Sequence, residues 1–299
     1  FMLSFLLLNM LEPLSGYTKN TAVLSMKEGL TGMVEDFRYE KERTNTFTQG
    51  DFTELEELEL TDKTALHVVM SKPTSLYLRG FIGSRYTSDA WKPLDYQVYN
   101  DSYALFYWLR KSQFNALNQF SAVHDLTSGP ADKQEKNISM TINNISANSK
   151  YLYTPYELET NLENFDNVKT FDDSMVISTS FFGERLYEYK SADNMIKNYP
   201  AVANDLYNVS KNKQTDNYFK NESYYNEYVY NNYLHIPKET KLVLQSHFEH
   251  LNDSKGNRMA YEEIMNQVKA DVKNTLTYNI DANPLPESKD FIQYLLEES

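Results

Sequence analysis

Few side chains in this sequence are of types that catalyse reactions, and the chain contains no cysteine. Without cysteine, these residues hold no thiol nucleophile, disulfide or thiolate metal site. His247 and His250 stand three residues apart on a predicted helix, with Glu249 between them. This spacing can place two imidazoles on one helix face, as metal sites require, but the order His-Glu-x-x-His is absent. The interpretation we favour is exposed or helix-capping histidines near a helix C-terminus.

Two other histidines have simple structural interpretations. His67 alternates with apolar residues in a predicted strand, which indicates a half-exposed sheet position, and His235 precedes Pro237, where packing is expected. We therefore name no catalytic residue, no cofactor-binding residue and no metal ligand, and we expect no cofactor.

Aromatic residues form the other candidate groups. Arg79 with Tyr86 and Trp91 predicts a cation–π group, which we interpret as a structural contact between strands. Six tyrosines gather in one stretch: Tyr218, Tyr224, Tyr225, Tyr228, Tyr230 and Tyr233. Their rings could stack on sugars or peptides, but packing of an amphipathic helix across a domain joint is the favoured interpretation.

Composition and charge limit the classes of protein. The chain has 299 residues, 41% hydrophobic and 24% charged, which is enough for two modest domains with packed cores. Its formal net charge is −13, and its basic residues are scattered singly among acids. A phosphate backbone would be repelled, so nucleic-acid binding is not expected.

The N-terminal part predicts a link to a membrane. Residues 1–8 are apolar but too short to span a bilayer, which takes about 20 residues. We interpret residues 1–15 as the end of a membrane span or a signal segment, which Pro13 and Gly16 would terminate. Apolar residues recur at helical spacing from Thr21 to Tyr39, which indicates a connecting helix within residues 16–42.

The middle of the chain predicts strands with one helix among them. The helix is expected over 102–122, and a turn at Gly183 separates the last two strands. The expected strands cover 65–70, 75–82, 138–142, 150–153, 175–181 and 185–189. We expect an antiparallel, sandwich-like, β-rich domain over residues 43–203.

The C-terminal part predicts helices. Residues 204–221 are polar and are interpreted as a linker. Ser288 is expected to cap the last helix, with Asp290 in its first turn. The expected helices cover 222–233, 239–251, 258–276 and 289–298.

Specific motifs appear at residues 228–299. Tyr230-Asn231-Asn232-Tyr233-Leu234-His235-Ile236-Pro237 matches a Tyr-x-x-Tyr-Leu-x-x-Pro pattern, and residues 278–286 match Tyr-x-Ile-x-x-x-Pro-x-Pro. Residues 290–299 read Asp-Phe-Ile-Gln-Tyr-Leu-Leu-Glu-Glu-Ser. In type, order and spacing these segments resemble the lead-in to the catalytic core of bacterial transglutaminase-like membrane proteins. Residues 76–91, with Leu-Arg-Gly, Tyr86 and Trp91, and residues 144–156 resemble the extracytoplasmic region of the same family.

The resemblance implies an α+β chain in which residues 222–299 are the helical N-terminal portion of a transglutaminase-like domain. In that family a nucleophilic cysteine follows within a few residues, and a histidine and an aspartate complete a papain-like triad. These positions would lie beyond Ser299, so no catalytic residue is carried over to this chain and it should be inactive alone.

The resemblance further implies a non-catalytic scaffold, membrane-anchored on the extracytoplasmic face of a bacterium. The parent protein would perform thiol-dependent amide hydrolysis or acyl transfer on a peptide or protein substrate. A cell-surface module that binds a peptide, a glycan or a partner protein is the alternative.

Overall fold

The computed structural model describes most of the chain after residue 61 and parts of the chain before it. The described residues are 30–39 except 32 and 36, 50–53, 62–128, 138–162, 165–170, 175–192, 196, 199–209, 212–251, 259–277 and 284–297. The predicted membrane or signal segment, residues 1–15, lies outside them. No helix in the described part is long and apolar enough to cross a membrane. Helices and antiparallel strands occur together, so the expected α+β class is confirmed.

A three-stranded antiparallel sheet organises the main core. β5 (Ile138–Asn144) lies at its centre between β1 (Leu66–Met70) and β9 (Leu186–Ser191). Burial alternates along β5 and β9, as expected when one face of a sheet packs and the other meets solvent. The buried residues of this core are Leu117, Met140, Ile142, Leu152, Leu158, Leu162, Val176, Tyr187 and Tyr189.

Three short ladders accompany the sheet. They pair β2 (Leu78–Arg79) with β6 (Thr154–Pro155), β3 (Arg85–Tyr86) with β4 (Trp91–Lys92), and β7 (Val168–Thr170) with β8 (Val176–Ser178). The strands expected over 75–82 and 150–153 are thus mostly irregular backbone. In the described part, the strands form one three-stranded sheet with two-stranded ladders rather than two sheets of similar size.

The single helix expected over 102–122 is wrong, because the chain breaks within it. α4 (Tyr96–Asp101) and α5 (Tyr103–Lys111) precede the break, and η1 (Ala116–Asn118) and α6 (Gln119–Thr127) follow it. Gln113 adopts a φ of 62°, and the Phe114 amide donates to the Leu109 carbonyl at 2.9 Å. This turn ends α5 and brings the Phe114 ring, 5% exposed, into a core.

The linker expected over 204–221 is also wrong in its secondary structure. α7 (Tyr199–Asn208) and α8 (Lys213–Asn232) occupy most of it. Asn212 caps α8, since its side chain accepts from the Thr215 amide at 3.0 Å while the Thr215 hydroxyl accepts from the Asn212 amide at 2.8 Å. Polar residues that suggest a loop in the sequence therefore form a capping box.

A second core joins helices from both sides of the predicted domain boundary. Its buried residues are Tyr99, Phe106, Leu109, Phe114, Val123, Leu206, Tyr218 and Tyr228. The division of the chain into a β-rich and a helical domain remains a prediction.

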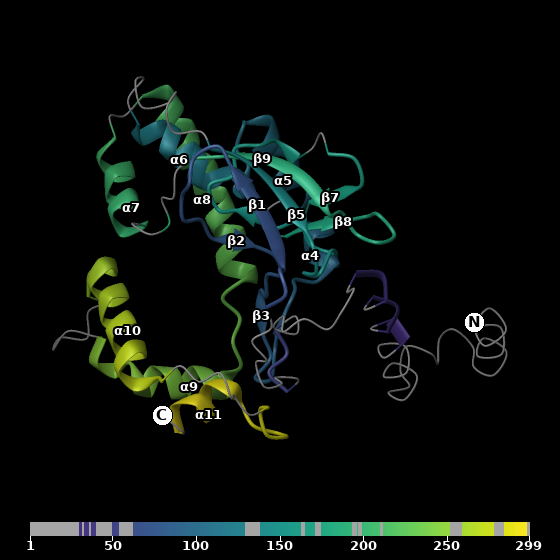
Figure 1. Cartoon of the computed structure of the whole chain (residues 1–299). Helices are drawn as coiled ribbons and strands as arrows, with labels where there is room; N and C mark the ends of the chain where they lie inside the picture. The colour runs from purple at the N-terminus through teal and green to yellow at the C-terminus, as the bar shows by residue number, and fades with distance from the viewer. Residues whose placement is uncertain are drawn as a thin grey trace.

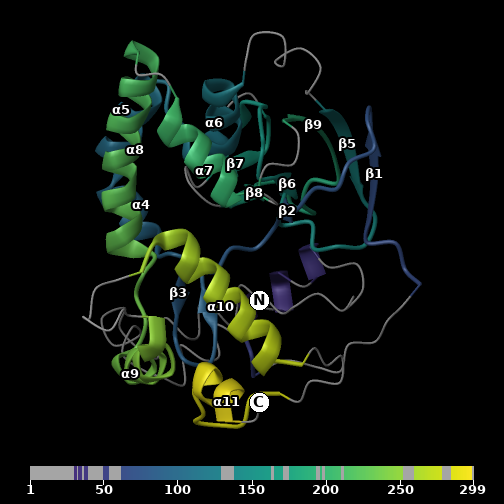
Figure 2. The ribbon, with the colours of Figure 1, turned by 90° about the vertical axis from the view of Figure 1, so that its left-hand side faces the viewer.

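The helices that follow α8 lie apart from the sheet. α9 (Lys238–His247), η4 (Glu249–Leu251), α10 (Tyr261–Thr275) and α11 (Phe291–Glu297) follow α8. Figures 1 and 2 both show α9, α10 and α11 below the sheet, with β3 reaching down towards them.

Candidate functional site: the joint at the start of the last helix

The hairpin of β3 and β4 supplies one side of a joint with the C-terminal segment. Tyr86 pairs with Trp91, and the Thr87 amide donates to the Ala90 carbonyl at 2.9 Å to close the turn. Ser88 adopts a φ of 70° within this turn. The Tyr86 side chain is 2% exposed although its strand has only two residues. The hairpin therefore presents a buried hydroxyl and the Ser88 carbonyl to α11.

The first amides of α11 are satisfied by this hairpin and by the helix cap. The Phe291 amide donates to the Ser88 carbonyl at 2.7 Å, and the Ile292 amide donates to the Tyr86 hydroxyl at 3.1 Å. The Gln293 amide donates to Asp290 Oδ1 at 3.0 Å. The start of a helix leaves amides without intrahelical partners, so the first two bonds fix α11 against the hairpin and the third caps the helix.

Asp290 links three segments through one carboxylate. Its Oδ1 lies 3.2 Å from the Tyr86 hydroxyl, and its Oδ2 accepts from the buried Thr240 hydroxyl of α9 at 2.6 Å. Because Asp290 caps the helix, the expectation that Ser288 is the N-cap is wrong; Ser288 instead adopts a φ of 64° in the turn before it. Both residues are types that favour caps, and the Thr240 and Tyr86 contacts that fix Asp290 come from far along the chain.

Apolar packing closes the joint beside the hydrogen bonds. The rings of Phe52 and Phe291 stack with centroids 3.8 Å apart and planes 5° from parallel. The Leu285 amide donates to the Phe52 carbonyl at 3.0 Å, and Leu285 is 6% exposed. Ile236, from the turn before α9, packs on the same cluster.

The titration of this site follows from its contacts. Burial opposes ionisation of Asp290, but hydrogen bonds from Thr240, the Gln293 amide, Ser88 and Tyr86 outweigh it and hold the pKa below its usual value. Burial raises the pKa of Tyr86, so its hydroxyl keeps its proton at neutral pH and donates to Asp290 or to the Ser88 carbonyl. The arrangement is suited to holding a helix in place, with every polar group directed at a neighbour in the fold.

The two histidines of the predicted helix do not come together as ligands. His247 Nε2 lies 2.7 Å from Asp271 Oδ2 and thereby links α9 to α10, whereas His250 Nδ1 lies 3.2 Å from the His247 carbonyl. Among the described residues, no group of three or more His, Cys, Asp or Glu side chains is placed to hold a metal ion. His67 is exposed on β1, and His235 is exposed as well, so the packing expected for it is wrong and its neighbour Ile236 packs instead.

The predicted cation–π group has different members. The Arg79 guanidinium lies 5.0 Å from the ring centre of Tyr156, and its Nη2 donates to the Leu117 carbonyl at 3.1 Å. Tyr86 and Trp91 contact each other, with ring centres 5.4 Å apart. The alternation of side chains along the strands could not reveal Tyr156, which belongs to a segment far along the chain.

The tyrosine cluster divides between core and surface. Tyr218 and Tyr228 are buried, and Tyr225 and Tyr233 pack against the same core, as the packing interpretation expects. Tyr224 and Tyr230 are 49% and 70% exposed, respectively.

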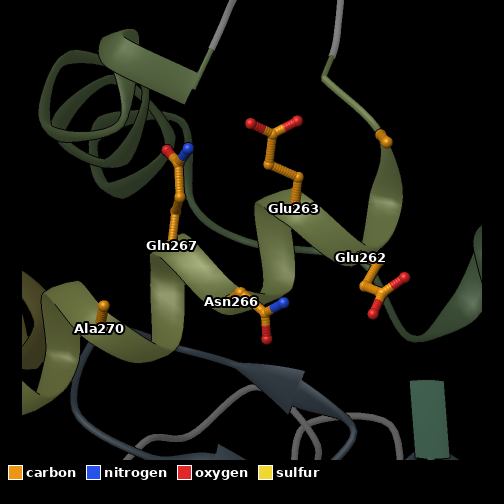
Figure 3. A pocket seen from close by; sticks show the side chains of 6 residues that line it. Glu262, Glu263, Asn266, Gln267 and Ala270 are labelled. Atoms are coloured by element: carbon orange, nitrogen blue, oxygen red, sulfur yellow. The ribbon is translucent and has the colours of Figure 1, made fainter. Parts of the chain in front are cut away.

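A surface hollow of about 430 Å³ on α10 does not form a binding site. Figure 3 shows that its side chains, among them Glu262, Glu263, Asn266 and Gln267, point in different directions, so no polar groups converge on one point.

Comparison with known proteins gave no relatives for this chain: no protein-family model, no curated protein and no solved structure matches it.

The joint predicts the effect of removing one hydroxyl. Tyr86→Phe leaves the half-buried Ile292 amide without its acceptor, and we expect a loss of about 1 kcal/mol in the free energy of unfolding. Hydrogen exchange should speed up first at the Ile292 and Gln293 amides. Tyr103→Phe, at a tyrosine that is 64% exposed on α5, is the matched control and should change neither measurement. Unaltered exchange in α11 of the Tyr86 variant would contradict the role of this hydroxyl.

A second prediction concerns pH. Since the folded chain lowers the pKa of Asp290, its carboxylate contributes stability that is full above the unfolded value of about 4 and is lost as the pH falls through the folded value below it. Asp290→Asn should therefore be less stable than the unsubstituted chain at pH 7, and this difference should shrink in denaturant titrations towards pH 3. The same substitution at the exposed Asp205, on α7, is the control for the loss of one surface carboxylate. A stability difference between Asp290→Asn and the unsubstituted chain that stays constant with pH would refute the stabilising role of the Asp290 carboxylate.

Proposed function

We propose that this chain is a non-catalytic, extracytoplasmic scaffold segment of a membrane-anchored transglutaminase-like protein. The parent protein would carry out thiol-dependent amide hydrolysis or acyl transfer on peptides or proteins. The chain itself, which has no cysteine, holds the helix that would precede the nucleophile.

The joint between the β3–β4 hairpin and α11 carries this proposal. The two segments that it joins, around Tyr86 and around Asp290, are two of those in which the sequence resembles the family. The contact between Tyr86 and Asp290 joins residues 204 positions apart in the chain. Two of the segments that resemble the family therefore lie against each other in the fold. A catalytic group must be held within about 0.5 Å of its productive position. A helix whose first turn is anchored by hydrogen bonds can hold a group that follows it with this precision.

The test uses the natural protein that carries this chain. We expect iodoacetamide to label a cysteine within about ten residues after Ser299, because a nucleophile positioned by α11 must follow it closely. Tyr86→Phe should lower the rate of amide cleavage or exchange on a peptide substrate, whereas the surface substitution Tyr103→Phe should leave the rate unchanged. A natural protein with no reactive thiol in that stretch would refute the proposal.

A groove between α5 and α8 favours the alternative, a module that binds glycans or peptides at the cell surface. Its volume is about 170 Å³, room for one sugar ring or side chain. Trp108 and Tyr224 line it with 66% and 49% exposure, respectively, and Asn217 spans it with a hydrogen bond to the Ser112 carbonyl at 3.2 Å. Exposed aromatic faces beside amides and the amine of Lys220 are a combination that suits a saccharide, whose rings are apolar on their faces and polar at their edges.

Fluorescence of the chain distinguishes this alternative. If the groove binds saccharides, chitin oligosaccharides should change the tryptophan emission in a saturable manner. Trp108→Ala should abolish the response, while Tyr207→Ala, at a residue that is 82% exposed on α7 outside the groove, should preserve it. If chitin oligosaccharides leave the tryptophan emission of the unsubstituted chain unchanged, glycan binding by this groove is refuted.

A further inference from the structure

The helical residues 30–31, 33–35 and 37–39, called the 30–39 helix below, present their apolar side chains to solvent rather than to the core. Leu30, Met33, Val34 and Phe37 follow the spacing of one helix face, and they are 39%, 71%, 42% and 74% exposed, respectively. An apolar stripe at this spacing normally faces the core. Here it faces away from the core, so it is available to something outside the chain.

The helix is attached by its other side to the segments around Ser149 and Phe181. Lys150 forms a 2.7 Å ion pair with Glu35, and Arg38 Nε donates to the Phe181 carbonyl at 2.9 Å. Tyr39 is 6% exposed, and its carbonyl accepts from the Ser149 amide at 3.1 Å. These contacts fix the orientation of the helix and keep its apolar stripe outward.

The turn between β8 and β9 extends the same apolar surface. Phe181 and Phe182 are 60% and 58% exposed, and the Arg38 guanidinium lies 4.8 Å from the Phe181 ring centre. Figure 1 shows the helix, in purple, below β8. Large exposed apolar side chains gathered from two elements indicate an interaction site.

Ser149 fixes this turn relative to the helix. Its Oγ lies 2.9 Å from the Phe182 carbonyl and 3.0 Å from the Tyr39 carbonyl. Gly183 closes the turn with a φ of 75°, and a Cβ there would collide with the Ser149 carbonyl oxygen. The exposed phenylalanines are thus held on a rigid support, which reduces the entropy lost when they are covered.

We propose that these six side chains form a membrane-facing surface whose tips insert into the interface of a lipid bilayer. The surface consists of Leu30, Met33, Val34, Phe37, Phe181 and Phe182. This inference rests on the membrane anchoring in the proposed function. It adds a second contact, made by the folded part of the chain, to the one expected from the N-terminal apolar run.

The position of the surface in the chain favours a bilayer. Residues 1–8 form an apolar run about twenty positions before the helix. Once such a run is held in a membrane, a neighbouring weak contact acts at high effective concentration and needs little affinity of its own. The Arg38 guanidinium lies beside the Phe181 ring, so its charge would stand in the headgroup layer next to the inserted ring.

A second copy of the chain fits this surface less well. A coiled coil with a second copy takes an apolar stripe of about three to four heptads, whereas this stripe covers two turns of the described helix. The phenylalanines of the turn would also lie outside such a pair. The formal net charge of −13 does not favour attraction to anionic lipids, so the contact should depend on apolar insertion and should tolerate salt.

Vesicle flotation of the full chain tests the inference. With phosphatidylcholine vesicles we expect binding that persists at 1 M salt, where electrostatic attraction is screened. The double substitution of Phe37→Ser with Phe182→Ser should weaken partitioning on the order of tenfold, because two apolar tips no longer leave water. The double substitution of Tyr103→Ser with Tyr207→Ser, at aromatic residues that are 64% and 82% exposed on α5 and α7, is the matched control and should partition as the unsubstituted chain does.

Three results would overturn the inference: no binding by the unsubstituted chain, equal binding by the double variant at Phe37 and Phe182, or a dimer in light scattering that the same two substitutions abolish. The last result would assign the surface to a second copy. None of them decides the scaffold proposal, which depends on the reactive thiol and on the protection of α11.

Discussion

The carboxylate of Asp290 and the hydroxyl of Tyr86 form the contact on which the lower part of the structure depends. Through them, α11 is fixed to a hairpin that precedes it by about 200 positions, and Thr240 brings α9 to the same point. The hairpin strands have two residues each, too few to be stable without such partners. Hairpin and helix thus stabilise each other, and the stacked Phe52 and Phe291 rings pack beside their hydrogen bonds.

A similar device holds the other end of the molecule. Ser149 is fully buried and ties the end of the helix at 30–39 to the β8–β9 turn. In both places a buried side-chain hydroxyl connects segments that are far apart in sequence, and apolar side chains lie beside it. At the Asp290 joint these side chains are buried, whereas at Ser149 they point outward. This difference separates a joint within the fold from a surface for an external partner.

Elements with a strong local pattern could be predicted from the sequence. The strands β1, β5 and β9 and the helix α10 lie close to the expected residues, because alternation and helical spacing are properties of neighbouring side chains. The end of α5 and the start of α8 are not apparent from the sequence, because at each point one or two residues change the path of the chain. Gln113 ends α5 with a positive φ, and Asn212 with Thr215 caps α8 inside a stretch that reads as a polar loop. Both features depend on local backbone geometry, which the residue types allow but do not require.

The sequence by itself determined the α+β class, the lack of a thiol in these residues and the segments that resemble a transglutaminase-like protein. It also contained the apolar stripe of residues 30–39, but not the direction in which it faces. Only the tertiary structure decided that Asp290 rather than Ser288 caps the last helix, that Arg79 packs on Tyr156, and that the stripe points outward. The physical reason is common to all three: each outcome is set by partners that are distant in sequence, such as Tyr86, Thr240 and Lys150, and sequence spacing carries no information about them.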